Sequence, residues 1–248
     1  MNTEHLILAG QWFFFGYFVL LNAGYLSLNL LAMLALPRHL EAQLFDTLPR
    51  RYSGFEPPVS ILVPAYNEEK TIGLSVRSML QLDYPEFEVI AVNDGSRDRT
   101  LQALIEEFAL VPYPEAYCRS VEAKAVRGVY RSTQFPNLRV IDKENGGKAD
   151  ALNAGINASR FPIVCGVDAD SILERASLRR VMAPFLHDPS VIASGGTVRI
   201  ANGCEVRDGF LETVRLPPRI LPLFQTLEYI RAFLVARVGW SKIRALGN

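Results

Sequence analysis

The stretch PPVSILVPAYNEEKTIGLSVRSML, residues 57–80, decides the fold class. Its apolar run 59–63 predicts a short buried strand that ends at Pro64. The apolar residues that follow recur at helical spacing: Ile72, Val76, Met79 and Leu80. A strand that leads at once into an amphipathic helix is the unit from which α/β domains are built.

The same unit recurs further along the chain. Apolar runs predict more strands, at 87–92, 138–141, 163–167 and 191–200, and apolar spacing predicts helices between them, at 101–108, 148–159 and 174–185. This alternation predicts an α/β fold with a mostly parallel sheet covered by helices on both faces. The insertion 109–136 is expected to be a solvated elaboration without chemistry. A sheet of this kind binds ligands at the carboxyl ends of its strands.

The chain opens with an apolar segment that can span a membrane. Residues 6–36 contain no Asp, Glu, Lys, Arg or His, and a helix of this length, at ~1.5 Å per residue, exceeds a hydrocarbon layer of ~30 Å. The run is too long for a core helix, and no Lys or Arg precedes it as in a signal peptide. We therefore expect a transmembrane helix within 1–40 and a linker over 41–57. Under the positive-inside rule, the basic residues that follow place the rest of the chain in the cytoplasm. These residues are Arg38, His39, Arg50 and Arg51.

Composition excludes several protein classes. Of the 248 residues, 26 are Lys or Arg, 26 are Asp or Glu, and 49% are hydrophobic. This balance argues against a disordered chain and against a polycationic nucleic-acid binder, so no nucleic-acid partner is expected. The cysteines, Cys118, Cys165 and Cys204, are widely spaced and are expected to be reduced and structural.

Polar motifs follow four of the predicted strands. They are Pro-Ala-Tyr-Asn-Glu at 64–68, Asn-Asp-Gly-Ser at 93–96, Asn-Gly-Gly-Lys at 145–148 and Asp-Ala-Asp at 168–170. Each motif alone is also ordinary turn chemistry. Because the carboxyl ends of parallel strands share one edge of a sheet, the four loops are expected to meet on one rim.

Two of these motifs suggest ligands. Asp168 and Asp170 follow a strand at i and i+2, so an extended backbone would point both carboxylates to the same side. Paired hard oxygen ligands suit Mg²⁺ or Mn²⁺. A glycosidase pair is the alternative, but its carboxylates act from opposite sides of a sugar, ~5 to 9.5 Å apart. Lys148, behind two glycines at the start of a helix, can bind an anion, although the spacing is not that of a Walker loop.

Taken together, the motifs resemble family 2 glycosyltransferases. The resemblance rests on PAYNEE at 64–69, NDGS at 93–96, GGKADALNAG at 146–155 and DAD at 168–170, in order over roughly 57–203. Within the family, the chain is similar to the membrane-bound processive branch that contains cellulose, chitin, hyaluronan and poly-N-acetylglucosamine synthases. This implies a GT-A fold over 58–203, a nucleotide-sugar donor, most often a UDP-sugar, Mg²⁺ or Mn²⁺, and inversion at the anomeric carbon.

The resemblance also implies a role for each matching residue in the first two loops. Tyr66 and Glu68 would contact the base and ribose. Asp94 would accept a hydrogen bond from the base ring N–H. Asn93 stands where many members have Asp, which weakens any role for that position.

In the other two loops, Lys148 would hold the diphosphate, and Asp168 with Asp170 would bind ribose and metal. The same resemblance places a general base and an acceptor-holding Trp motif C-terminal to Asn248, so that the chain is expected to be part of a longer enzyme. No catalytic residue is therefore assigned within the sequence.

The expected function is polysaccharide synthesis at the inner or plasma membrane, with a polysaccharide or lipid-linked acceptor. Transfer of a single sugar to a polyprenyl phosphate lipid, and a nucleotide-sugar-binding module without turnover, are the alternatives. The segment 204–248 carries an apolar face on a basic helix, either at the membrane interface or packed on the core. The face consists of Leu223, Leu227, Ile230, Leu234 and Val238.

Overall fold

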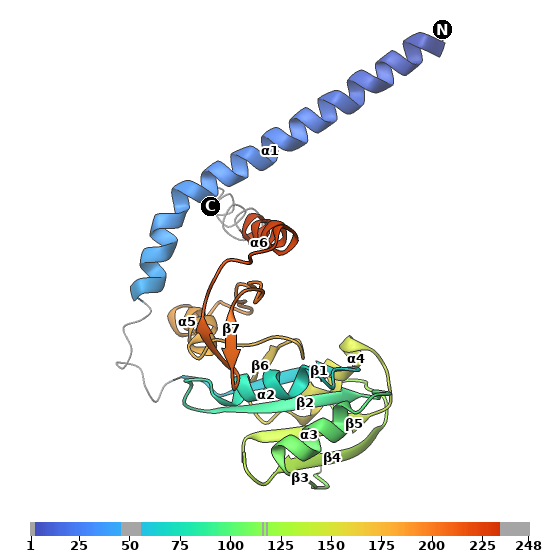
Figure 1. Cartoon of the computed structure of the whole chain (residues 1–248), viewed down its shortest axis with the longest axis vertical. Helices are drawn as coiled ribbons and strands as arrows, with labels where there is room; N and C mark the ends of the chain where they lie inside the picture. Colours follow the sequence, from blue (N-terminus) through green and yellow to red (C-terminus); the bar gives the residue numbers. More distant parts are fainter. Residues whose placement is uncertain (1–2, 46–55, 116, 118, 234–248) are drawn as a thin grey trace. The chain divides into compact units, whose positions relative to one another are not determined.

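The computed structural model describes residues 3–45, 56–115, 117 and 119–233, and these form two compact units. One unit holds the helices α1, Thr3–Phe45, and α6, Ile220–Phe233. The other holds the β-sheets (Figure 1). Cys118 and residues 234–248 lie outside the described residues.

The central sheet confirms the predicted α/β architecture with a mostly parallel sheet. Its strands β5, β2, β1 and β6 are neighbours in that order, and each pairs with the next in parallel (Figure 1). The bounds are β1 Val59–Ala65, β2 Phe87–Asp94, β5 Leu138–Lys143 and β6 Ile163–Gly166. β1 and β2 are buried along almost their whole length, as expected for strands covered on both faces.

The insertion 109–136 is more than a solvated elaboration, so that expectation was wrong in part. It contains β3, Leu110–Pro112, and β4, Val126–Ser132, which extend the sheet by antiparallel pairing onto β5. β4 is half-buried along most of its length because it lies near the edge of the sheet. Its sequence, VRGVYRS, mixes polar and apolar residues, so a search for apolar runs does not find this strand.

Helices cover both faces of the sheet, as predicted. One face carries a core cluster with side chains from α2, α3 and α5, and the other carries a cluster with α4. The bounds are α2 Ile72–Leu80, α3 Thr100–Phe108, α4 Lys148–Ala158 and α5 Ser177–His187. On the α4 face, small residues of the helix such as Ala151 and Ala154 allow it to pack closely on Ile90 and Val92.

The prediction of a strand at 191–200 was wrong. None of these described residues is in a strand, and the side chain of Ile192 is 96% exposed. Gly195 and Gly196 interrupt the apolar run, which weakens strand formation. A short hairpin follows instead, with β7, Glu205–Arg207, paired antiparallel to β8, Phe210–Thr213.

Helix α1 contains a candidate membrane span. Ile7–Leu31 is long and apolar enough to cross a bilayer, and none of its most apolar window is buried in the structure, unlike a core helix of a soluble protein. Its polar side chains bond back to the helix's own carbonyls: Asn22 to Phe18, Ser27 to Ala23 and Asn29 to Tyr25. Internal satisfaction of this kind suits a lipid environment.

Helix α6 leaves its apolar side chains exposed. Leu221 is 81% exposed and Leu227 is 55% exposed. Whether this segment lies at the membrane interface or packs on the core stays a prediction. Glu228 on the same helix pairs with Arg231 at 2.7 Å in an exposed ion pair.

Candidate functional site

The predicted rim is present at the carboxyl ends of the parallel strands. Ala65 of β1 is in register with Asn93 of β2, and Asn93 is in register with Asp142 of β5. The three strands therefore end at one edge of the sheet. The loops that carry the predicted site residues all leave the sheet at this edge.

The loop that carries Tyr66 is fixed by the loop after β2. Asn67 has a left-handed backbone with φ 58°, its N–H donates to Ser96 Oγ at 3.0 Å, and its Oδ1 accepts from the Arg97 N–H at 2.8 Å. Glu69 and Asp98 are linked in the same way, because the Glu69 N–H donates to Asp98 Oδ2 at 3.2 Å. These bonds hold the loop while Tyr66 stays 43% exposed. Its ring is thus presented to solvent at the rim.

Glu68 is half-buried and is used locally. Its Oε2 accepts from the Thr71 hydroxyl at 2.6 Å, and its N–H donates to Thr100 Oγ1 at 2.8 Å. Its carbonyl accepts from the N–H of Ile72, the first residue of α2. Contact of Glu68 with a base or ribose stays a prediction.

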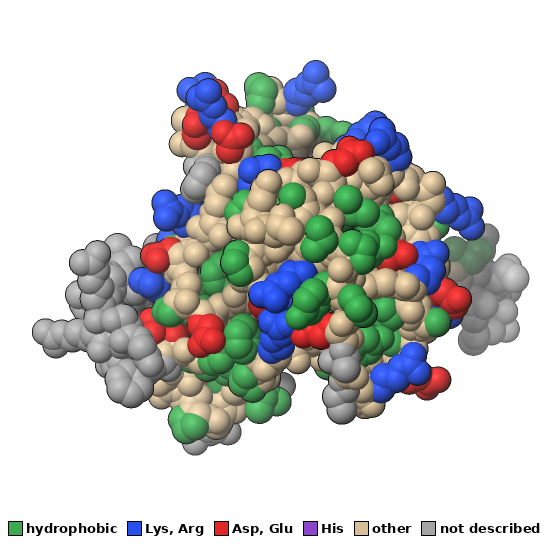
Figure 2. Space-filling view, turned by 90° about the horizontal axis from the view of Figure 1, so that it is seen from below, with side chains coloured by type: hydrophobic (Ala, Val, Ile, Leu, Met, Phe, Trp, Pro, Cys, Tyr) green, Lys and Arg blue, Asp and Glu red, His purple; other side chains and the backbone are tan. Residues whose placement is uncertain are grey.

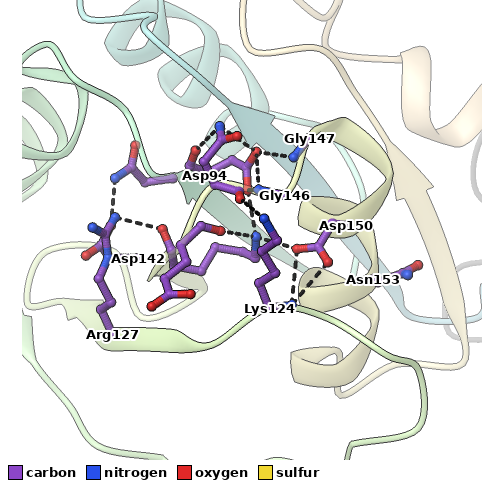
Figure 3. A network of polar contacts seen from close by, with 12 residues as sticks. Asp94, Lys124, Arg127, Asp142, Gly146, Gly147, Asp150 and Asn153 are labelled. Carbon is purple, nitrogen blue, oxygen red and sulfur yellow. Dashed lines mark hydrogen bonds and ion pairs between the residues drawn. The ribbon is translucent and has the colours of Figure 1, made fainter.

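Asp94 lies at the end of β2 and is only 2% exposed. Its Oδ2 accepts from the Gly147 N–H at 2.7 Å and from Asn145 Nδ2 at 3.2 Å, and its Oδ1 accepts from the Gly146 N–H at 3.0 Å and from Lys143 Nζ at 2.6 Å. Figure 3 shows this network with Gly146 and Gly147 beside the carboxylate. Asp94 thus holds the loop that begins α4.

Lys143 and Asp150 were not among the site residues predicted from the sequence. Lys143 is fully buried, and its ammonium forms ion pairs with both Asp94 and Asp150. Bonding to Lys143, and to the Lys124 backbone N–H, holds the pKa of Asp150 below its ordinary value. A lowered pKa means that this contribution to stability is present above the ordinary pKa and is lost as the pH falls through the lowered one. The feature of the sequence that could have indicated this network is a lysine at the end of an apolar strand.

Two glycines make this arrangement possible. Gly95 has φ 65°, and a Cβ there would lie 2.7 Å from the backbone nitrogen of Asn145. Gly147, the N-cap of α4, has φ 89°. Both values favour glycine, and the first also requires the close approach of two loops.

Lys148 and Asp168 are brought together, although their strands β5 and β6 are not neighbours. Lys148 is the first residue of α4, and its ammonium forms an ion pair with Asp168. Both side chains are exposed, at 64% and 57%. This pair is a charged, solvent-accessible part of the rim.

The backbone at Asp168 and Asp170 differs from the expected extended strand. β6 ends at Gly166, and the Ser171 N–H donates to the Asp168 carbonyl at 3.0 Å, which makes a turn. Even so, Asp168 and Asp170 are both exposed while Ala169 between them is 4% exposed. Among the described residues, no group of three or more His, Cys, Asp and Glu side chains is placed to hold a metal ion. Two carboxylates alone still fit Mg²⁺ or Mn²⁺, which keep positions for water and phosphate oxygens.

Asn93 lies on the opposite face of the sheet from Asp94. Its Nδ2 donates to Asp142 Oδ1 at 2.7 Å, and Asp142 also pairs with Arg127 at 2.9 Å.

On the face of the molecule shown in Figure 2, basic and acidic side chains are interspersed, in line with the balanced composition. Cys165 is a free thiol, and burial raises its pKa.

Comparison with known proteins identifies relatives of this chain. A model of the protein family described as Glycosyl transferase family 2 matches residues 60–216. The poly-beta-1,6-N-acetyl-D-glucosamine synthase of Staphylococcus epidermidis is 29% identical over 157 residues, which cover 63% of this chain and 32% of that protein. The synthase of the same name from Staphylococcus aureus strain COL matches equally, at 29% identity over the same shares. The chain thus spans about a third of the length of these curated relatives.

Solved structures also align with part of the chain. Staphylococcus aureus TarS, residues 1–349, in complex with UDP-GlcNAc is 27% identical and has a TM-score of 0.39, covering 52% of this chain and 31% of that one. The mannosyltransferase PcManGT from Pyrobaculum calidifontis, in complex with GDP-Man and Mn²⁺, is 24% identical and has a TM-score of 0.43, covering 66% and 45%.

Proposed function

Because this chain belongs to glycosyl transferase family 2, we propose that it binds a nucleotide-sugar donor, a UDP-sugar, and serves the inverting transfer of the sugar to a growing polysaccharide. The synthases that it resembles are named for a polymer of N-acetylglucosamine, which favours a polymer over a single transfer to a lipid. The mostly parallel α/β sheet supports the GT-A fold implied by the resemblance. The observation that carries the proposal is the exposed Lys148–Asp168 pair on the rim.

Lys148 is proposed to hold the diphosphate of the donor. It stands at the N-terminus of α4, where first-turn N–H groups lack partners within the helix and the helix dipole favours an anion. An exposed ion pair contributes only ~0 to 1 kcal/mol, so Lys148 can leave Asp168 at little cost. Tyr66 and Glu68, on the neighbouring loop, are proposed to contact the base and ribose.

Asp168 and Asp170 are proposed to hold Mg²⁺ or Mn²⁺, with Asp168 also near the ribose. A bound divalent ion would neutralise negative charge on the leaving nucleoside diphosphate. In the transfer, an acceptor hydroxyl attacks the anomeric carbon, the bond to the diphosphate oxygen breaks, and Lys148 stabilises the charge that develops there. The proton of the hydroxyl goes to a general base that is not assigned to any residue of this chain.

The metal proposal is tested by calorimetric titration of the full chain with UDP. We expect Mn²⁺ or Mg²⁺ to strengthen UDP binding by roughly tenfold, or about 1.4 kcal/mol, since phosphate oxygens complete the ion's coordination. Asp170→Ala should remove most of this metal dependence. Asp188→Ala, which changes an exposed aspartate at the end of α5, should leave it intact. Equal UDP affinity of the unmutated chain with and without chelator would overturn the assignment.

The apolar segment of α1 is proposed to anchor the chain in the cell membrane with the rim in the cytoplasm. Arg38 follows the span Ile7–Leu31, and Arg50 and Arg51 follow further on, as positive-inside orientation requires. Protease added to intact spheroplasts that express the full chain should leave residues from Tyr66 onward uncut. The same protease should cut them once the membrane is permeabilised. Cleavage in intact spheroplasts would reverse the proposed orientation.

A further inference from the structure

Helix α2 carries two serines on its buried face. Ser75 and Ser78 are each 1% exposed and lie among the apolar residues of the helix that pack on the sheet. Residues three apart are neighbours on a helix surface. A buried hydroxyl costs free energy unless it forms a hydrogen bond. The partners of the two hydroxyls therefore show what serine does at positions where alanine would favour the helix more.

Both hydroxyls bind the Asp loop, residues 167–173, which carries the two exposed aspartates of the rim. Ser75 Oγ donates to the carbonyl of Ser171 at 2.7 Å, across 96 residues of sequence. Ser78 Oγ accepts from the Leu173 N–H at 3.1 Å and donates to the Ser75 carbonyl at 2.7 Å. Within a helix, a serine hydroxyl usually bonds to a carbonyl of the preceding turn, whereas that of Ser75 bonds out to this loop.

The first part of the Asp loop is fixed by the sheet and the core. The Val167 N–H donates to the carbonyl of Leu62 in β1 at 2.9 Å. Ala169 is 4% exposed and belongs to the core cluster. The loop is thus fixed at its start by β1, in its middle by Ala169 and at its end by α2. The two aspartates lie between these three points, which therefore determine where the carboxylates are presented.

Helix α2 itself begins at the loop that carries Tyr66. The carbonyl of Glu68 accepts from the N–H of Ile72, the first residue of α2, at 3.0 Å. Ser75 follows about one turn later, since a helix has ~3.6 residues per turn. One short helix therefore sets the spacing between the loop proposed to contact base and ribose and the loop proposed to hold the metal.

The β7–β8 hairpin holds the other end of α2. Gln81 Nε2, at the C-cap of the helix, donates to the Asp208 carbonyl at 2.9 Å. The tip of the hairpin lies so close that a Cβ on Gly209 would be 2.9 Å from the Ser78 nitrogen. Because α2 is held at both ends, it can serve as a fixed support for the Asp loop.

We propose that Ser75 and Ser78 are positioning residues, which hold Asp168 and Asp170 in the geometry that binds a divalent ion together with the donor diphosphate. The inference rests on the proposed function, because it assumes that these carboxylates hold the ion. Mg²⁺ demands a near-octahedral arrangement of its ligands, so displacement of a carboxylate lowers the affinity for the ion. Both serines are buried, so they act through the loop and not on the donor itself.

The test compares Ser75→Ala, Ser78→Ala and the double variant with Ser132→Ala. Ser132 is the matched control, because it is also buried, donates to the Phe108 carbonyl at 2.7 Å and accepts from the Phe135 N–H at 2.9 Å. It ends β4 near the start of β5, at the opposite end of the sheet from the rim. Alanine is the best helix former, so the variants in α2 should keep the helix.

Calorimetry measures the UDP affinity of the full chain in detergent, with Mg²⁺ or Mn²⁺ and with chelator, per folded molecule by circular dichroism. The unmutated chain and Ser132→Ala should gain about tenfold in affinity from the ion. In the three α2 variants this gain should fall to about twofold, since one lost hydrogen bond corresponds to about fivefold in affinity. Their UDP affinity in chelator should not change, because Lys148 belongs to α4 and not to the Asp loop.

Hydrogen exchange of the metal-free chain, followed by mass spectrometry, gives a second readout. Ser78→Ala removes the acceptor of the Leu173 N–H, and Ser75→Ala removes the donor to the Ser171 carbonyl. Both variants should therefore raise the exchange rate of a peptide that covers the Asp loop by about fivefold. Ser132→Ala should leave the exchange of this peptide as it is in the unmutated chain.

The outcomes separate this inference from the proposed function. A gain from the ion that survives in Ser75→Ala and Ser78→Ala would overturn the inference, as would an equal loss of the gain in Ser132→Ala. Unchanged exchange of the Asp loop in both single variants would overturn it as well. UDP binding by the unmutated chain without any gain from the ion would contradict the metal assignment and this inference with it. Absence of UDP binding by the unmutated chain would contradict the proposed function itself.

Discussion

Arg139→Met is expected to lower the free energy of unfolding by about 3–5 kcal/mol, because it leaves a buried carboxylate without its cation. Arg139 is 4% exposed, and the Glu88 carboxylate that it pairs with is 6% exposed. Ser60 Oγ and the Arg160 N–H still donate to Glu88, at 2.6 and 2.8 Å, but neither carries a charge. The variant also loses the bonds of Arg139 to Ala158 and Glu115.

Urea denaturation of the full chain in detergent, followed by circular dichroism, measures this loss. Arg180→Met is the matched control, because Arg180 pairs with Glu174 at 2.7 Å in an exposed ion pair, which contributes ~0 to 1 kcal/mol. Adding Glu88→Leu to Arg139→Met should recover much of the loss, since an apolar pair replaces the unpaired charge. A loss below about 1 kcal/mol in Arg139→Met would contradict the account.

Phe108→Ala is expected to cost about 3–5 kcal/mol, the range for removing a buried aromatic ring. Phe108 is the last residue of α3 and is fully buried. Its ring meets that of Phe135 edge-on at 5.9 Å, and the guanidinium of Arg77 lies 5.8 Å from its centroid. Its carbonyl accepts from the Ser132 hydroxyl at the end of β4 at 2.7 Å.

The same denaturation experiment tests this variant. Val111→Ala is the control, because Val111 of β3 is 45% exposed and loses little buried surface on truncation. Phe108 packs α3 against the β3–β4 insertion. The unfolding transition of Phe108→Ala should therefore come at a lower urea concentration than that of the unmutated chain. A transition that matches that of Val111→Ala would show that the cavity is filled by rearrangement.

The strands of the parallel sheet could be predicted because their sequences report burial directly. β1 and β2 are covered on both faces, so they read as apolar runs, and a polar loop follows each one at the rim. β4 could not be found in this way, since this half-buried strand next to the edge strand β3 mixes polar and apolar residues. The run at 191–200 gave the opposite error: its apolar residues predicted a strand, but the structure assigns none of them to a strand.

The arrangement of the candidate site was predictable where its residues are exposed, and less so where they are buried. Lys148 and Asp168 follow strands in loops rich in turn residues, and the structure brings them into contact. In the sequence, Lys143 is a charged residue at the end of a predicted strand, and a charged side chain at such a position is normally solvated. Its burial depends on Asp94, which is 49 residues away in the chain. A contact between residues so far apart in the sequence produces no local pattern that would predict it.

The position of β1 in the sheet also has a consequence during synthesis on the ribosome. β1 pairs with β2 on one side, but its other neighbour, β6, follows about 100 residues later, with Val59 in register with Ile163. At about 5–20 residues per second, that edge of β1 waits roughly 5–20 s for its partner. An unpaired apolar strand edge is a template for aggregation. The nascent chain therefore passes through a window in which a chaperone that covers this edge would raise the yield of folded protein.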